Sequence, residues 1–228
     1  MKPSSYVKEP EMEPEIRKEN VETLLDKKFL RVYDLKYAPG KHYFNASRRT
    51  ADDLAAVRDD DAFRKMLPDA VSCVVVLRIP GEEDRLLLTH EYRYPAGRYL
   101  LGIPAGLMDP EDKDCPEPAL ETAKREIREE TGLTVGEKDS LFVLNPLLFS
   151  SPGMTDESNA LVCAVIHVPD LSGLTQSGTE GAECIRDFVT VTRDEAEELL
   201  KNGTDHNGFF YSIFTWASLT VFVNGMYL

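Results

Sequence analysis

The sequence predicts an α/β protein of mixed α+β type, in which a mixed sheet is sandwiched between helices and a small antiparallel β unit comes first. Three observations support this fold class. Apolar, Val-rich runs interleave with segments of helical periodicity. Turns containing Pro and Gly at 38–41 and 80–83 join neighbouring runs as hairpins. The chain has 228 residues, and 42% of them are apolar, which is enough for a buried core.

Three segments are expected along the chain. Residues 1–20 are expected to be a flexible leader, because they are charged, contain proline and lack the apolar stretch of a signal peptide. A cytoplasmic location is therefore expected. A small N-terminal β unit is expected over residues 21–68 and the main domain over residues 69–228. Within the N-terminal unit, strands are expected at 29–37 and 42–47, and short helices at 52–58 and 61–66.

The main domain is expected to open with a central strand, because residues 71–79 form a Val-rich apolar run. A long irregular loop is expected after residue 103. Pro118 suits the first turn of a helix and Gly132 its C-terminal end, which predicts a helix over 118–131. The other strands are expected at 85–92, 99–103, 141–149, 160–168 and 185–192, and another helix at 193–201.

The C-terminal stretch 209–228 is largely apolar and about as long as a membrane span. Polar residues interrupt it, so no membrane association is expected. One helical face is formed by Ile213, Trp216, Ala217, Thr220 and Val221. We therefore expect a packed C-terminal helix with Trp216 in the core.

The formal net charge of −14 repels polyanions, and no run rich in Lys or Arg offsets it locally. Nucleic acid is therefore not an expected partner. A small phosphate ester is compatible with this charge if divalent cations lie between the carboxylates and the substrate. The four cysteines have no metal-ligand spacing, and Cys73 and Cys163 lie in apolar runs, where a reduced thiol behaves as a small hydrophobe.

The predicted helix 118–131 carries an acidic edge. Glu126, Glu129 and Glu130 stand at i, i+3 and i+4, so they project from one face beside the apolar residues Ala123 and Ile127. Like charges at this spacing repel by roughly a few tenths of a kcal/mol per pair. Crowded carboxylate oxygens are the ligands that Mg²⁺ or Mn²⁺ requires. Taken alone, the same three residues also fit a solvated acidic stripe.

A longer pattern favours the metal-binding interpretation. With fixed spacing and aliphatic residues between them, its constrained positions are Glu117, Arg125, Glu126, Glu129, Glu130 and Gly132. This pattern resembles the second half of the Nudix box, and the chain is identified on it as a member of the Nudix hydrolase superfamily. The resemblance implies the Nudix fold and metal-dependent hydrolysis.

The first half of the box departs from the family pattern. The family places a Gly six residues before its first Glu, but position 111 here is Glu. Gly106 looks like the equivalent Gly, which implies five extra residues within 107–116. We expect these residues to form an enlarged loop that alters substrate access.

Two flanking segments resemble the ADP-ribose pyrophosphatase branch of this superfamily. The first runs through 91–95 and 103–107, and the second through Ser150-Ser151-Pro152-Gly153 to Glu157. The likeness covers roughly residues 27–228. Gly102 stands where the branch usually has Glu, so hydrolysis of another nucleoside diphosphate sugar, such as a GDP- or UDP-hexose, is an alternative.

The resemblance implies a role for individual residues. The backbone carbonyl of Ala105 and the carboxylates of Glu126, Glu129 and Glu130 would bind the metal, and Arg125 would hold Glu129 by an ion pair. Glu183 would bind metal or abstract a proton, with Glu180 as the substitute. The substrate contacts implied are Arg93 for phosphate or ribose, Tyr43 and Phe44 for the base, and Pro152 and Gly153 of the second segment.

The implied chemistry is hydrolysis of a small nucleotide-sugar substrate. Magnesium ions, with Mn²⁺ as an alternative, would neutralise the pyrophosphate and lower the pKa of an attacking water. ADP-ribose would give AMP and ribose 5-phosphate. The resemblance also implies a homodimer held by the N-terminal unit. A non-catalytic module that senses ADP-ribose is a second class of function, and the intact acidic positions of the helix argue against it.

Overall fold

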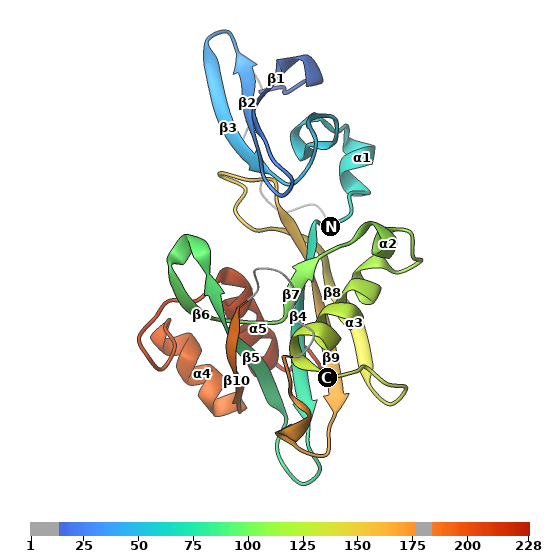
Figure 1. Cartoon of the computed structure of the whole chain (residues 1–228), viewed down its shortest axis with the longest axis vertical. Helices are drawn as coiled ribbons and strands as arrows, with labels where there is room; N and C mark the ends of the chain where they lie inside the picture. The colour runs from blue at the N-terminus through green and yellow to red at the C-terminus, as the bar shows by residue number, and fades with distance from the viewer. Residues whose placement is uncertain (1–13, 177–183) are drawn as a thin grey trace, which may run out of the picture. The chain divides into compact units, whose positions relative to one another are not determined.

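The computed structural model describes residues 14–176 and 184–228, which form two units (Figure 1). One unit runs to Met66 and includes Ser151–Glu157, and the other comprises Leu67–Ser150 and Ser158–Leu228. The segment 151–157, which the sequence interpretation assigned to the main domain, thus belongs to the N-terminal unit. The cause is local pairing, because the amide of Ala46 donates to the carbonyl of Met154 at 3.0 Å.

The N-terminal unit contains a three-stranded antiparallel sheet in the order β1-β2-β3. Its strands are β1 (Val21–Asp26), β2 (Arg31–Ala38) and β3 (Lys41–Ser47). The sequence predicted β2 and β3 but missed β1. Almost all residues of β1 are exposed, so no alternation of buried apolar and exposed polar side chains marks it as a strand. Lys18–Asn20, inside the expected leader, form a 3-10 turn, and residues 1–13 lie outside the described ones.

The helices after β3 are shorter than expected. The predicted helix at 52–58 was wrong, because Ala51–Asp53 and Ala55–Val57 form two separate 3-10 turns. Leu54 lies between them and is fully buried with Tyr33 and Leu35, so burial of one side chain interrupts the helix. The second predicted helix corresponds to α1 (Asp60–Arg64), which Asp59 caps.

The main unit is built on a seven-stranded mixed sheet with the order β10-β5-β4-β9-β8, in which β6 also pairs with β5 and β7 with β4. Among the described strand pairs of this sheet, only β4–β9 is parallel. The strands are β4 (Ala70–Arg78), β5 (Arg85–Arg93), β6 (Arg98–Gly102), β7 (Ala105–Leu107), β8 (Ser140–Phe149), β9 (Ser158–His167) and β10 (Ile185–Val191). The expected mixed sheet is thereby confirmed.

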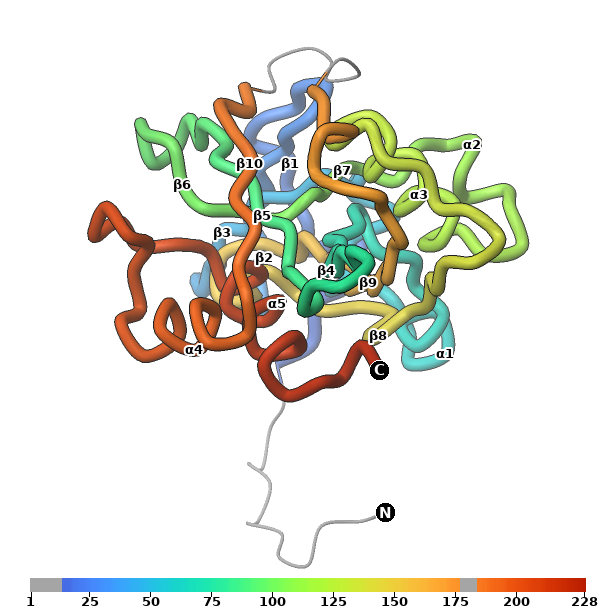
Figure 2. The backbone as a smooth tube through the Cα atoms, turned by 90° about the horizontal axis from the view of Figure 1, so that it is seen from below, coloured from blue at the N-terminus to red at the C-terminus, as the bar shows by residue number. Residues whose placement is uncertain are grey.

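Helices cover both faces of this sheet, as predicted (Figures 1 and 2). They are α2 (Pro110–Lys113), α3 (Pro118–Thr131), α4 (Arg193–Asn202) and α5 (Ile213–Val223). Alternation along β4 assigns the faces: Val75 packs in a core with Ile127 of α3, whereas Val74 packs in a second core with Phe222 of α5. The expected irregular loop after residue 103 was wrong in part, since it contains β7 and α2.

The C-terminal helix is packed, but on a different face from the one predicted. The buried residues of α5 are Thr215, Ser218, Leu219, Val221 and Phe222. Trp216 is 51% exposed, so its expected core position was wrong. Eight of the eleven side chains of α5 are apolar, and two of the buried ones, Thr215 and Ser218, are polar. Periodicity of apolar residues therefore could not identify the buried face, and contact with the sheet decides it. In the described part of the chain, no helix is long and apolar enough to span a membrane.

Candidate active site

The acidic helix α3 places two carboxylates inside the protein. Ala123 and Ile127 are fully buried in the core, which fixes the rotation of the helix on the sheet. Glu126 and Glu130 stand beside them and are only 5% and 3% exposed. The side chain of Glu129, at the outer edge, is 32% exposed. The predicted position of this acidic edge, at the border of the buried face, is confirmed.

Strand β7 brings its backbone against these carboxylates. A Cβ atom on Gly106 would overlap the carboxylate of Glu126, so only glycine fits at this position. The amide of the neighbouring Ala105 donates to Oε2 of Glu130 at 3.2 Å. Pairing of β7 with β4 holds this backbone in place. The carbonyl of Ala105, a predicted metal ligand, therefore belongs to the same small strand as the glycine that admits Glu126.

Arg125 links the helix to the segment before it. Its Nη1 donates to Glu126 Oε1 at 2.7 Å and to Glu129 Oε2 at 3.2 Å, which confirms the predicted ion pair with Glu129. Its Nη2 donates to Asp112 Oδ2 and to the carbonyl of Leu107, both at 2.8 Å. Burial by itself lowers the pKa of Arg125, but the carboxylates around it outweigh this effect and raise the pKa above its ordinary value.

Asp112 is a site residue that the sequence interpretation missed. It accepts from Thr122 Oγ1 at 3.0 Å in addition to Arg125 and is 9% exposed, whereas Glu117 is exposed. The missed signal was spacing, because Asp112 lies six residues after Gly106. Asp112 therefore occupies the place expected of the first acidic residue of the box, and the five extra residues lie between Asp112 and α3.

The donor set around α3 suits a hard divalent cation. Two buried carboxylates and a backbone carbonyl offer oxygen ligands only, which Mg²⁺ and Mn²⁺ prefer. The charges of Glu130 and Glu126 add to burial in raising the pKa of the Cys73 thiol, so this thiol stays neutral and apolar beneath them. Within residues 14–176 and 184–228, no group of three or more His, Cys, Asp or Glu side chains is arranged to hold a metal. The predicted Glu183 and its substitute Glu180 lie outside the described residues.

Arg93, a predicted substrate contact, lies at the end of β5 and forms an ion pair with Glu91 at 2.6 Å. The neighbouring surface is aromatic and cationic, a feature that the sequence interpretation did not identify. Tyr92 and Tyr99 meet edge to face at 5.3 Å, and the guanidinium of Arg186 lies over the Tyr99 ring at 4.8 Å. Guanidinium groups and aromatic rings at one place can contact the phosphate and the base of an anionic, aromatic ligand.

The remaining predicted substrate contacts lie in the N-terminal unit. The hydroxyl of Tyr43 donates to the carbonyl of Gly153 at 2.6 Å, so the structure brings these two predicted residues together. Pro152 is exposed, and Phe44 is 60% exposed. The Tyr43 ring and the Phe44 ring therefore are not buried in the strand core, which leaves aromatic surface available to a ligand or a partner.

Comparison with known proteins bears on this site. A model of the NUDIX domain matches residues 66–211, which is more than half of the chain. The ADP-sugar pyrophosphatase of Mus musculus is 28% identical over 127 residues, covering 56% of this chain and 54% of that protein. The ADP-ribose pyrophosphatase of Saccharomyces cerevisiae is 31% identical over 102 residues, covering 44% of this chain and 40% of that protein.

The curated relatives are matched over only part of their length, about half in the mouse protein. A crystal structure of an ADP compounds hydrolase has a similar fold, with a TM-score of 0.58 and 20% identity. That similarity covers 96% of this chain and 98% of the other. At this identity the similarity supports the fold alone.

Proposed function

This chain belongs to the Nudix hydrolase family, and from that premise we propose that it hydrolyses the pyrophosphate bond of ADP-ribose or a related nucleoside diphosphate sugar with Mg²⁺. For ADP-ribose the proposed products are AMP and ribose 5-phosphate, and Mn²⁺ is the proposed substitute ion. The similarity to relatives named ADP-sugar pyrophosphatase and ADP-ribose pyrophosphatase supports this substrate class.

The observation that carries the proposal is the pair of buried carboxylates on α3. Burying a carboxylate is costly unless it is paired, hydrogen-bonded or bound to a metal. The guanidinium of Arg125 is shared among Asp112, Glu126 and Glu129. Divalent cations would supply the further positive charge that this group of acids favours.

In this proposal, the chain's own residues hold and orient the reacting groups. Glu126, Glu130 and the carbonyl of Ala105 hold the ions, which when bound supply charge neutralisation of the pyrophosphate and an acidified water. Glu129 serves as a further ligand, and Arg125 fixes its carboxylate. Glu183 binds metal or accepts the proton of the attacking water, with Glu180 as the substitute for either role.

The substrate is proposed to be oriented by the cationic and aromatic surface at the end of β5. Arg93 is 46% exposed on its side chain and can exchange Glu91 for a phosphate oxygen. Arg186 and Tyr99 present a second guanidinium and a ring beside it. Base stacking is assigned to Tyr43 and Phe44 of the N-terminal unit, whose rings are exposed.

The test is product analysis by chromatography after incubation with Mg²⁺. ADP-ribose, UDP-glucose, GDP-mannose and 8-oxo-dGTP are compared at equal concentration. AMP formed fastest from ADP-ribose supports the proposal. Faster cleavage of UDP-glucose or GDP-mannose would support the alternative, a pyrophosphatase for another nucleoside diphosphate sugar. Binding of ADP-ribose without turnover would favour the sensing module.

We also propose that the protein is a homodimer joined through the N-terminal unit. The strands of this unit and the β1–β2 turn expose large apolar side chains, namely Leu24, Phe29, Leu30, Tyr43 and Phe44. Exposed apolar side chains clustered in one small unit are typical of an interface. Light scattering measures the mass directly: a dimeric mass that becomes monomeric in Leu24→Asp supports the proposal, and a monomeric native mass contradicts it.

A further inference from the structure

Arg186 is the extra residue of a β-bulge at the start of β10. Ile185 pairs with Glu91, and Asp187 pairs with His90, the next residue of β5, so Arg186 pairs with no residue of that strand. A bulge re-aims a side chain, and bulges are frequent next to active sites. This bulge lies at the end of β5, where the substrate is proposed to be oriented. The backbone of β10 therefore turns one guanidinium out of the regular alternation of the strand.

The carboxylate of Asp187 joins Arg186 to the interior of the main unit. Its Oδ2 accepts from Nε of Arg186 at 2.9 Å, and its Oδ1 is hydrogen-bonded to Nδ1 of His90. Burial raises the pKa of Asp187, but the hydrogen bonds from His90 and Arg186 outweigh burial and lower the pKa below 3.8. Because an ionised carboxylate only accepts, Nδ1 of His90 is the donor. Asp187 therefore holds two donors at once, one on each oxygen.

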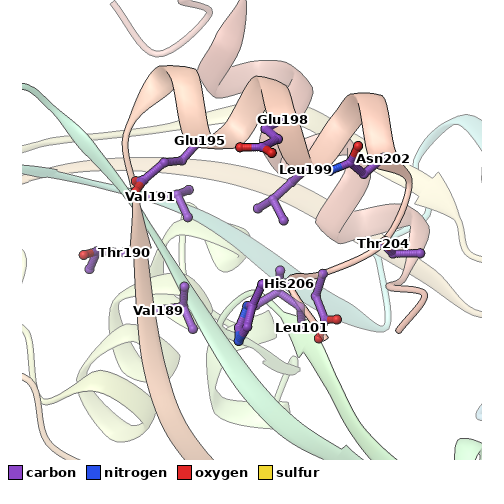
Figure 3. A pocket seen from close by; sticks show the side chains of 11 residues that line it. Leu101, Val189, Thr190, Val191, Glu195, Glu198, Leu199, Asn202, Thr204 and His206 are labelled. Atoms are coloured by element: carbon purple, nitrogen blue, oxygen red, sulfur yellow. The ribbon is translucent and has the colours of Figure 1, made fainter. Parts of the chain in front are cut away.

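His90 is a fixed support for this carboxylate, because its side chain is only 3% exposed. The ring of His206 meets the His90 ring edge to face, with 5.7 Å between the centroids. Figure 3 shows His206 close to Leu101 in the pocket between β10 and α4, and Leu101 is the partner of His90 on β6. Packing on this side holds the imidazole in place. Through Asp187, it also fixes the Nε edge of Arg186.

The flat face of the Arg186 guanidinium has a support of its own. It lies over the ring of Tyr99 at 4.8 Å, an arrangement that attracts a cation to the ring. The hydroxyl of Tyr99 is hydrogen-bonded to Sγ of Cys184 at 3.1 Å, which holds the ring. Within residues 14–176 and 184–228, the two terminal nitrogens of Arg186, Nη1 and Nη2, have no hydrogen-bond partner.

Arg78 shows what a carboxylate does when both of its oxygens are available to one arginine. Its Nε and Nη2 donate to the two oxygens of Asp84 at 3.0 and 2.9 Å, so one edge of that guanidinium is filled. Arg186 differs, because Asp187 gives its second oxygen to His90. The side chain of Arg186 is 48% exposed. Its Nη1–Nη2 edge offers two parallel N–H groups, a geometry that matches two oxygens of a phosphate.

We propose that Arg186 binds a phosphate group of the substrate through Nη1 and Nη2, and that Asp187, supported by His90, is the positioning residue that aims it. This inference rests on the proposed function, because the nucleoside diphosphate sugar supplies the phosphate. Asp187 then strengthens anion binding although it is itself an anion. A carboxylate that acts only by its charge has the opposite effect, since its removal favours a negatively charged ligand.

The test is isothermal titration of the full-length protein with the α,β-methylene analogue of ADP-ribose in the presence of Mg²⁺. A methylene group replaces the bridging oxygen of the pyrophosphate, so binding is measured without cleavage. Arg186→Lys keeps the charge and removes the two parallel donors. Asp187→Ala is made in the native protein and in Arg186→Ala. The matched control is Arg193→Lys, at an exposed arginine that begins α4. Urea unfolding establishes that each variant is folded.

Arg186→Lys should weaken binding about tenfold to a hundredfold, the size expected for charge-assisted hydrogen bonds. Asp187→Ala should weaken it about threefold or more in the native protein and leave it unchanged in Arg186→Ala, because the two residues act as one unit. Arg193→Lys should bind as the native protein does. The proposal is overturned by full binding in Arg186→Lys, by tighter binding in Asp187→Ala, or by an equal loss from Asp187→Ala in both backgrounds. Absence of analogue binding to the native protein at millimolar concentration would also overturn it.

Steady-state turnover of ADP-ribose separates this inference from the proposed function. Asp187→Ala should raise KM and change kcat little. Analogue binding that depends on Arg186 and Asp187, without turnover of ADP-ribose by the native protein, would contradict the proposed hydrolysis and leave the phosphate contact in place. Turnover by both the native protein and Arg186→Ala with the same KM would overturn the phosphate contact and leave the hydrolysis in place.

Discussion

The two sides of the main sheet both bury carboxylates, and they balance the negative charge in different ways. On the α3 side, Arg125 donates to Asp112, Glu126 and Glu129 within 3.2 Å. On the α4 side, Asp205 is as deeply buried, but its neighbour is a histidine, and Nε2 and Oδ2 are both without hydrogen-bond partners. Glycine admits a carboxylate on the first side, whereas two backbone amides hold the carboxylate on the second.

The comparison of the two sides shows that the groups around a buried acid decide how its negative charge is balanced. Several carboxylates, a carbonyl and one shared guanidinium form an oxygen-rich group that favours small divalent cations. On the α4 side, a single buried carboxylate accepts from two backbone amides and lies 3.7 Å from the imidazole of His90, so its neighbours come from the chain itself. Residue type alone does not separate the two cases, because both depend on Asp and Glu.

The largest expected effect is the loss of a buried carboxylate on α3. Glu130→Gln should lower kcat by roughly 10³-fold, because metal-dependent charge stabilisation contributes several kcal/mol to the barrier. Steady-state rates on ADP-ribose with Mg²⁺ measure this. The matched control is Glu121→Gln on the same helix, where Glu121 pairs with Lys124 at the surface. Full turnover by the Glu130 variant would remove the main support for the proposed function.

The next effect tests the backbone approach at β7. Gly106→Ala should displace the Glu126 carboxylate, because the added Cβ overlaps it. We expect activity to fall by roughly 10²-fold, as for a misplacement of about 1 Å near the chemistry. Gly173→Ala is the control, since a Cβ there meets nothing within 4 Å. Equal rates for the two variants would contradict the tight fit at Gly106.

A smaller effect separates Asp112 from Glu117. Asp112→Asn should lower activity by about 10- to 100-fold, the usual size for a group that orients a metal ligand. Glu117→Gln should change it little, because Glu117 is exposed. Steady-state kinetics on the two variants measure the difference. A larger loss of activity in the Glu117 variant would mean that Glu117, and not Asp112, is the first acidic residue of the box.

The same Asp112 variant has a pH signature. Burial raises the pKa of Asp112, but hydrogen bonds from Arg125, Thr122 and the Asp109 amide outweigh burial and lower it below 3.8. Ionised Asp112 therefore stabilises the fold above pH 3.8, and this contribution is lost as the pH falls through the lower folded-state pKa. Urea unfolding at several pH values should show the stability gap between the native protein and the variant closing in acid.

The smallest effect is expected at Asp205, and it has the opposite sign. In Asp205→Asn the side-chain amide can donate to Nε2 of His90, an atom that lies 3.7 Å from Asp205 Oδ2 and has no hydrogen-bond partner in the native protein. We expect the free energy of unfolding at pH 8 to rise by about 0.5–1.5 kcal/mol, the net value of one hydrogen bond. Urea denaturation measures it. A fall in stability would mean that His90 carries a proton on Nε2 and already donates to Asp205.

Much of the fold could be predicted because its patterns are local. Neighbouring residues alone predict β4 from its Val-rich run, and they predict the two ends of α3 from Pro118 and Gly132. Exposed β1 and the two turns around Leu54 could not be predicted in this way, since long-range pairing and the burial of one side chain decide them. For α5, the buried face includes the polar residues Thr215 and Ser218, so a search for an apolar face placed Trp216 in the core wrongly.

The sequence by itself determined the acidic helix, the family resemblance and the ion pair between Arg125 and Glu129, because a spacing of four residues on a helix specifies contact directly. Only the tertiary structure decided that Asp112 joins Arg125 from thirteen residues away, that Gly106 touches Glu126, and that His90 faces Asp205. These contacts join separate elements, and their distances are set by how strands and helices pack, which no local pattern encodes.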